Sequence, residues 1–334
     1  MMLFPFWGKG RPENGRFERY SEIGRSLFEM TSLEEADIAV MPVAWELVTG
    51  NEPAMDLARE FAEKAEASGK RVIIFFWSDC DEEVPIDNAV VFRTSMYRSK
   101  RRTNEYAMPA WSDDFVAKYE VGKLRVREKS ERPVVGFCGY ALPLKPSLGR
   151  KLRTVLRKCA AFPEEKEMQP KSGAAIRTEA LRYLSQSKQV ATNLVIRDRF
   201  LAGTQLADGR VDLDAFSKAQ SEYVQNMIGS DYILCARGGG NFSYRLYETL
   251  SCGRIPIFVD TDCVLPYDFA FDWKRHCVWV DLGELSKIAE RVIEFHDGLS
   301  SQQFIDLQRE NRALWEQWLS PEGFFANLHR HFPE

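Results

Sequence analysis

The fold class of this 334-residue chain is decided by one stretch, Ser230-Asp-Tyr-Ile-Leu-Cys-Ala-Arg-Gly-Gly-Gly-Asn-Phe-Ser-Tyr-Arg-Leu-Tyr-Glu-Thr-Leu-Ser-Cys-Gly-Arg-Ile-Pro-Ile-Phe-Val259. Its pattern predicts a buried strand over 232–235, a glycine turn, a helix over 243–252 and a second strand over 255–259. A strand, a helix and another strand in this order form the repeating unit of a parallel sheet covered by helices. The stretch therefore predicts an α/β protein.

The same alternation of strands and helices extends along the rest of the chain. Further strands are expected over 1–7, 36–43, 72–77, 89–92, 134–139 and 191–196, and further helices over 147–159, 214–228 and from Pro53 to a stop at Gly69. The pattern weakens into a charged stretch before Pro133, so we place the domain boundary there. Residues 1–130 and 131–334 are then two Rossmann-like domains. Apolar residues at helical spacing between Leu307 and Trp318 predict C-terminal helices that pack back across the body.

Composition bounds the class of protein and its partners. With 45% hydrophobic residues, 28% charged residues and a net charge of −4, the chain is expected to be soluble and globular, without the basic excess that nucleic acid requires. The longest apolar run, Val72 to Trp77, is far shorter than the roughly 20 residues that span a bilayer. The seven cysteines show no Cys-x-x-Cys spacing and are expected to be reduced, mostly buried thiols of a cytoplasmic protein.

The glycine turn is the first candidate for chemistry. Gly238, Gly239 and Gly240 permit positive φ and close approach of the backbone, and Asn241 or Ser243 can cap the helix that follows. The free N–H groups and the dipole of such a helix attract an anion, so phosphate is the expected ligand. The plain alternative is a tight connection between a strand and a helix.

Two charged residues on the next helix favour phosphate. Arg245 and Glu248 stand three residues apart and share a face of the helix. A cation beside the turn suits a pyrophosphate, and a carboxylate one turn further suits ribose hydroxyls. A surface ion pair is the alternative. The spacing matches neither a P-loop nor the Gly-x-Gly-x-x-Gly fingerprint, so a nucleotide-sugar site fits better.

The segment resembles the exostosin family of glycosyltransferases. The family's signature, Ser-x-Arg-x-x-Glu-x-Leu-x-x-Gly-x-Ile-Pro-Val followed by Leu-Pro-Phe, corresponds here to Ser243, Arg245, Glu248, Leu250, Gly253, Ile255, Pro256, Ile257, Leu265, Pro266 and Tyr267. The preceding Arg/Gly-rich turn, which begins at Arg237, belongs to the same resemblance. The similarity continues at Asp272-Trp273 and 278–280, and upstream at 134–139 and 150–156, so it covers about half of the chain.

The resemblance implies a GT-B fold, in which two Rossmann-like domains face a cleft, and inverting transfer of a sugar. The donor would be a nucleoside diphosphate sugar, a UDP-sugar by family, and the acceptor a hydroxyl of a glycan or glycolipid. No cofactor or metal is required in this interpretation. Because the sequence shows no N-terminal anchor of the kind that eukaryotic relatives carry, a cytoplasmic enzyme is expected. The bland alternative is a catalytically silent protein that binds a nucleotide or glycan.

The catalytic base is expected to be a carboxylate. All four histidines lie after residue 275, so the first domain cannot supply an imidazole. Glu46 and Asp79 each follow a predicted strand, at the edge where α/β sheets carry their chemistry, although either could be an ordinary loop acid. Asp79 and Asp81 also form an Asp-x-Asp pair, which leaves a metal-dependent transferase as an alternative.

A basic cluster lies in the first domain, at Arg93, Arg98, Lys100, Arg101 and Arg102. Such runs are usually solvated loops, and that is our prediction here. The functional alternative is contact with an acidic or lipid-phosphate-linked acceptor at the inner face of a membrane.

Overall fold

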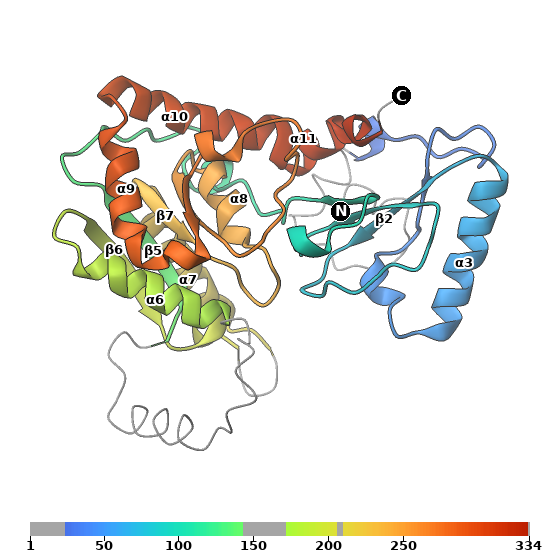
Figure 1. Cartoon of the computed structure of the whole chain (residues 1–334), viewed down its shortest axis with the longest axis horizontal. Helices are drawn as coiled ribbons and strands as arrows, with labels where there is room; N and C mark the ends of the chain where they lie inside the picture. The colour runs from blue at the N-terminus through green and yellow to red at the C-terminus, as the bar shows by residue number, and fades with distance from the viewer. Residues whose placement is uncertain (1–23, 143–171, 206–209, 333–334) are drawn as a thin grey trace, which may run out of the picture.

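The computed structural model describes residues 24–142, 172–205 and 210–332, and it contains two parallel sheets (Figure 1). The strands of the first sheet lie in the order β1 (Ala39–Val40), β2 (Val72–Phe76), β3 (Ala89–Arg93) and β4 (Glu105–Ala107). Those of the second lie in the order β6 (Ala191–Arg197), β5 (Val134–Tyr140), β7 (Tyr232–Cys235), β8 (Ile255–Asp260) and β9 (Val278–Asp281). The predicted α/β architecture is confirmed. The expected strand over 1–7 and helix over 147–159 lie outside the described residues.

The first sheet is covered on one face by α3 (Glu52–Ala67). Asn51 caps this helix through its side chain, and Pro53 occupies the first turn, where its missing N–H costs nothing. The small residues Ala58, Ala62 and Ala65 form the buried stripe of the helix and pack with Val72 and Ile74 of β2. Because strand side chains alternate, Ile73 and Phe75 point to the opposite face.

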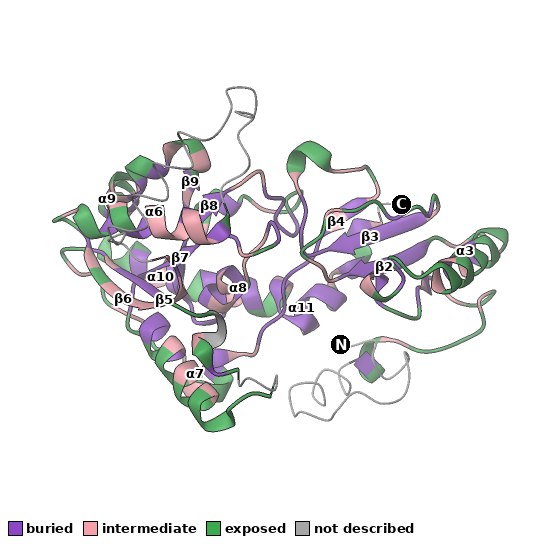
Figure 2. Cartoon of the chain, turned by 90° about the horizontal axis from the view of Figure 1, so that it is seen from below, coloured by how far each residue is buried: buried purple, intermediate pink, exposed green. Residues whose placement is uncertain are grey.

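The second sheet is covered on both faces. One face packs against α6 (Gly173–Gln186) and α9 (Ile288–Asp297), and the other against α7 (Leu213–Ile228) and α8 (Tyr244–Ser251). Strands β7 and β8, in the middle of the sheet, are buried along their whole length, whereas the edge strand β6 is only partly buried (Figure 2). A parallel sheet buried on both faces requires strands of this uniformly apolar composition.

The C-terminal helices join the two sheets. Figure 1 shows α10 (Ser301–Leu314) running from the second sheet toward α11 (Pro321–Ala326), with the π-helical turn Trp315–Leu319 between them. The Phe324 ring lies 5.5 Å from that of Phe92, and the Phe325 ring 5.8 Å from that of Phe75. The predicted packing of C-terminal helices back across the body is therefore confirmed.

Both sheets contribute to one hydrophobic cluster. Phe75 and Phe92 of the first sheet and Ile233 and Phe258 of the second belong to it, together with residues of α8 and α11. The predicted boundary between residues 130 and 131 lies after the short helix α4 (Phe115–Tyr119) and before β5. That boundary stays a prediction, because the apolar core does not divide there.

Several elements differ from the sequence-based expectation. The strand expected over 36–43 is only Ala39–Val40, since Pro42 has no N–H and the last ladder bond is the one from Met41 N to Ile73 O, at 2.9 Å. Helix α6 and strand β4 were not expected. Short 3-10 helices occur at Trp45–Leu47, Arg98–Lys100, Phe200–Gly203, Trp273–Arg275, Leu282–Lys287 and Leu328–His331.

Two further expectations concern the cysteines and the membrane. Of the six cysteines in the described residues, all are free thiols, and Cys80 alone among them is exposed; Cys159 lies outside that part of the chain. Within the described ranges, no helix combines the length and apolar character needed to cross a bilayer.

Candidate functional site

A pocket of about 430 Å³ opens at the carboxyl ends of the strands of the second sheet. In this sheet β5 lies between β6 and β7: the chain passes from β5 to β6 on one side and then crosses to β7 on the other, so the direction of the strand order reverses between β5 and β7. Ligands of open α/β sheets bind at such a switch point. The pocket is lined by Asp79, Cys138, Gly139, Tyr140, Arg177, Arg197, Ala202, Phe216, Ala219, Gln220, Tyr223, Gly238, Gly239, Phe242, Ser243, Tyr244, Arg245 and Glu248.

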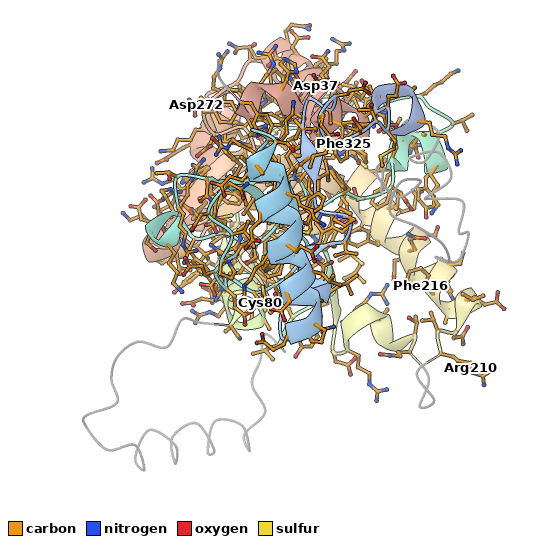
Figure 3. All side chains as sticks on the ribbon, turned by 90° about the vertical axis from the view of Figure 1, so that its right-hand side faces the viewer. Asp37, Cys80, Arg210, Phe216, Asp272 and Phe325 are labelled. Atoms are coloured by element: carbon orange, nitrogen blue, oxygen red, sulfur yellow. The ribbon has the colours of Figure 1, made fainter. Side chains whose placement is uncertain are left out.

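A second, more open hollow of about 520 Å³ is lined by residues 268–274 and Trp279, and none of the predicted site residues lies there. In Figure 3, Asp272 of this hollow lies near the top of the view. Cys80, the neighbour of Asp79, and Phe216 of α7 lie in the lower half. The pocket at the switch point is therefore the candidate functional site.

The glycine turn, residues 238–240, needs glycine for a reason other than the expected one. All three residues are described and have φ outside the left-handed region, so the expectation of positive φ is wrong. Instead, a Cβ on Gly239 would overlap the carboxylate of Asp79, and one on Gly240 would lie 2.8 Å from Asp79 Cα. The glycines let the loop after β2 approach the turn after β7.

Ser95 fixes that approach. Its hydroxyl is fully buried, donates to the carbonyl oxygen of Asp79 at 3.1 Å and accepts from the backbone N–H of Asn241 at 2.9 Å. The turn itself is closed by a hydrogen bond from Gly238 N to Phe242 O, at 3.1 Å. Asp79 is thus held at the edge of the glycine turn by the backbone, while its side chain stays exposed in the pocket wall.

The N-terminus of α8 is uncapped by side chains in the described part of the chain. Ser243 occupies the N-cap position with extended backbone, but its side chain makes no capping hydrogen bond. Asn241 does not cap either, because its amide donates to Met96 O at 3.1 Å and accepts from the Thr261 hydroxyl at 2.6 Å. Neither side chain thus occupies this end of α8, where the positive end of the helix dipole meets the pocket wall formed by Ser243, Tyr244 and Arg245 and favours an anion.

Arg237 and Asn241 lie outside the lining of the pocket. Arg237 donates from Nη1 to the hydroxyl of Tyr97 at 2.8 Å. Asn241 is fully buried against Met96. Both residues, predicted at the donor, join the glycine turn to residues 95–97 of the first domain.

Arg245 is held on three sides. Its guanidinium carbon lies 4.5 Å from the centre of the Phe137 ring and 5.7 Å from that of Tyr223, within the range of cation–π attraction. Its Nη2 donates to Cys138 O at 3.0 Å. Gly139 has φ 151°, and a Cβ there would lie 2.8 Å from the same nitrogen, so only glycine admits the guanidinium. The Nε of Arg245 is buried without a hydrogen-bond partner.

Glu248 lies one turn further along α8 and lines the same pocket. It accepts a hydrogen bond from the hydroxyl of Tyr223 on α7, at 2.5 Å. Burial and then the negative charge of Glu248 raise the pKa of Tyr223 well above its usual range, so this hydroxyl keeps its proton and remains a donor. Tyr223 thereby contacts both functional side chains that the sequence predicts on α8.

Two pocket arginines were not predicted from the sequence. Arg177 comes from α6 and Arg197 from the end of β6. Arg197 forms an ion pair with Glu222 of α7. Arg197 follows directly on the predicted strand over 191–196, and this position at the carboxyl end of a strand could have indicated a site residue. Nothing in the sequence analysis pointed to Arg177, because the helix that carries it was not expected.

The two candidate bases occupy different places. Asp79 lines the pocket from the side of the first sheet. Glu46 accepts a hydrogen bond from the backbone N–H of Trp77 at 3.2 Å and is not among the described residues that line the pocket. Asp81 pairs with Lys100 at 2.5 Å, so one carboxylate of the Asp-x-Asp pair has a cation of its own.

The basic cluster is a set of ion pairs. Arg93 is 2% exposed and pairs with Glu105, so the prediction of a solvated loop is wrong for this residue. Arg102 pairs with Glu83 and Glu105. Two others cross to the second domain, where Arg98 meets Asp260 at 3.1 Å and Arg101 meets Asp268 at 2.6 Å. The cluster fastens the two halves of the molecule together beside the pocket.

Comparison with known proteins adds distant similarities. No protein-family model matches the chain. Exostosin-1 of Drosophila melanogaster is 26% identical over 114 residues, which amount to 34% of this chain and only 14% of that protein. Among solved structures, TarM has a TM-score of 0.33 at 9% identity and covers 79% of this chain and 55% of its own. A glycosyltransferase from Rickettsia africae ESF-5 has a TM-score of 0.35 at 12% identity, and the match covers 85% of this chain and 82% of that one.

Proposed function

We propose that this chain is a GT-B glycosyltransferase that transfers a sugar, with inversion, from a nucleoside diphosphate sugar to a hydroxyl of a glycan or glycolipid. The nucleotide is uridine diphosphate by the resemblance to exostosins. The observation that carries the proposal is the pocket at the switch point, where the N-terminus of α8 and the guanidinium of Arg245 converge. The partial similarity to Exostosin-1 supports the same class of reaction.

The leaving diphosphate is the group that this pocket suits. In an inverting transfer the acceptor oxygen bonds to the anomeric carbon as the bond to the diphosphate oxygen breaks, and negative charge builds on the phosphate. The positive end of the α8 dipole and Arg245 favour that charge, and little reorganisation is needed because stacking on Phe137 and Tyr223 already holds the guanidinium. Glu248 would accept hydrogen bonds from ribose hydroxyls.

Asp79 is the base that we propose. It lines the same pocket as Arg245 but follows a strand of the first sheet, so it could take the proton of an acceptor that enters between the two halves. We do not assign the role of base to Glu46, because its carboxylate accepts a hydrogen bond from the backbone N–H of Trp77 and so holds the end of β2 in place.

We propose a reaction without a metal ion. Asp81 is engaged by Lys100, so Asp79 is the carboxylate of the Asp-x-Asp pair that lines the pocket, where we assign it the role of base.

The test combines donor binding with turnover. Thermal shift and release of nucleoside diphosphate are measured with a panel of nucleotide sugars, for the unaltered chain and for Arg245→Met. We expect Arg245→Met to lose at least about 100-fold in transfer, the loss typical when one oxyanion donor is removed. Arg309→Met is the matched control, because Arg309 is an exposed arginine paired with Asp306 on α10.

Full transfer by Arg245→Met would overturn the proposed site. Donor binding without turnover across a broad panel of acceptors would favour the silent nucleotide-binding protein. Loss of transfer on addition of a chelator would favour the metal-dependent alternative at Asp79 and Asp81.

A further inference from the structure

Arg177 is a half-buried cation without an acidic partner in the described part of the chain. Its two Nη atoms donate to backbone carbonyls, to Arg237 O at 2.9 Å and to Tyr140 O at 3.4 Å. Its Nε is buried and has no hydrogen-bond partner. Burying a charge is costly unless an opposite charge or a full set of hydrogen bonds compensates it. The chain itself supplies neither to Arg177.

The other cations of the pocket are compensated. Arg197 has Glu222 as its ion-pair partner. Arg245 stacks on the rings of Phe137 and Tyr223. Burial by itself would lower the pKa of Arg245, but Tyr223, Cys235 and the carboxylate of Glu248 together raise it above its usual value. Arg177 alone among these three arginines lacks a local counter-charge.

Arg177 also lies close to Arg245. Burial lowers the pKa of Arg177 to about 10, and the positive charge of Arg245 is the next largest cause. Both guanidiniums line the same pocket, beside Gly238 and Gly239. Two cations that repel each other in a half-buried pocket gain most from a ligand with more than one negative charge.

We propose that Arg177 is a second anion-binding residue, which shares a diphosphate with Arg245 and with the N-terminus of α8. The inference rests on the proposed function in that the diphosphate belongs to a nucleotide sugar, but the recognition itself requires only adjacent phosphates. Because Arg177 also donates to the carbonyl of Arg237, it connects the bound phosphate to the glycine turn. The ligand supplies the counter-charge that the chain omits.

Inorganic pyrophosphate is the probe that separates this inference from the proposed function. Its dissociation constant is measured by calorimetry for the full chain and for three variants, Arg177→Gln, Arg177→Lys and Arg182→Gln. We expect Arg177→Gln to weaken binding at least tenfold and Arg177→Lys to restore part of the loss, since it retains the charge. Arg182→Gln is the matched control, an exposed arginine of the same helix α6 that lies over the Tyr183 ring outside the pocket, and should change binding less than threefold.

The outcomes are distinct. Pyrophosphate binding by Arg177→Gln equal to that of the unaltered chain, or no binding by the unaltered chain, overturns the inference. Should Arg177→Gln fail to fold, Arg177→Lys decides: binding reduced no more than in Arg182→Gln supports a charge role, whereas binding abolished in a folded Arg177→Lys variant assigns the residue to loop geometry alone and overturns it. Binding that depends on Arg177 in a chain that transfers no sugar would refute the proposed function and leave this inference standing.

Discussion

Arg254, which is fully buried, and Arg177, which is half-buried, both lie beside the second sheet, and neither forms an ion pair in the described part of the chain, yet they differ in how many of their nitrogens are hydrogen-bonded. Every side-chain nitrogen of Arg254 donates a hydrogen bond within the chain. Nε and Nη2 donate to Ile228 O, Nη1 donates to Gln308 Oε1 at 3.0 Å, and Nη2 also donates to Arg125 O at 2.7 Å. Arg177 leaves Nε unbonded and faces a pocket. The fully bonded guanidinium of Arg254 holds elements together, whereas that of Arg177 lines the pocket and is placed to meet a ligand.

The largest effect on stability is expected from Arg254→Met. The variant leaves the acceptors on Ile228, Arg125 and Gln308 without their donor in a fully buried place, which should cost about 3 kcal/mol of unfolding free energy. Denaturant unfolding measures the loss. Arg245→Met is the comparison and should lose no more than about 1 kcal/mol; equal losses in the two variants would remove the distinction between structural and ligand-binding arginines.

An intermediate effect is expected from His331, whose Nε2 is also buried and unbonded but lies among aromatic rings rather than at the pocket. Burial lowers its pKa to about 4, against a weaker opposing contribution from the carbonyl of Leu328. The unfolded chain, with a pKa near 6.5, therefore binds a proton first as the pH falls. This contribution to stability is complete above pH 6.5 and is lost as the pH falls toward 4.

Removing the imidazole should flatten that part of the pH profile. We expect the stability of His331→Leu to depend less on pH between about 6.5 and 4, by about 2 kcal/mol, in unfolding experiments across this range. His329→Gln, at an exposed neighbour, should keep the original slope. A profile for His331→Leu that parallels the unaltered chain would show that the unbonded Nε2 carries no penalty.

The smallest effect is expected from Tyr223→Phe. The variant removes the hydroxyl that donates to Glu248 but keeps the ring beside Arg245, so donor affinity should fall about fivefold to tenfold, or about 1 kcal/mol, with little change in stability. The nucleotide-sugar dissociation constant measures it. Tyr183→Phe on α6, where the ring contacts Arg182, should bind the donor normally. Unchanged affinity in Tyr223→Phe would mean that Glu248 needs no positioning.

The fold could be predicted where the sequence carries a local signal. The run from Ser230 to Val259 shows β7, α8 and β8 because strand and helix periodicity switch at the glycines. Helix α6 was missed, although Ile176, Ala180, Leu181 and Leu184 form its buried stripe at helical spacing. The length of β1 depends on Pro42 and on pairing with β2, which is distant in sequence.

The candidate site could likewise be predicted only in the part whose residues are close together in the sequence. Gly238, Ser243, Arg245 and Glu248 are neighbours in sequence, so their shared pocket could be predicted. Arg177 joins them through α6, a separate element of the fold, and this requires the order of strands in the sheet. The cross-domain contacts of Arg237 and Asn241 could not be predicted either, because their partners Tyr97 and Met96 belong to the other domain.

The packing of α11 on the first sheet has a consequence for synthesis. Phe75 of β2 and Phe92 of β3 are buried against Phe324 and Phe325, so these two strands receive part of their core from residues 321–326. On the ribosome, β2 and β3 emerge well before that helix and present an unfinished apolar face until translation passes it. Protection of the nascent chain by chaperones is therefore most needed over this interval, and slow translation between the two regions would lengthen the exposure.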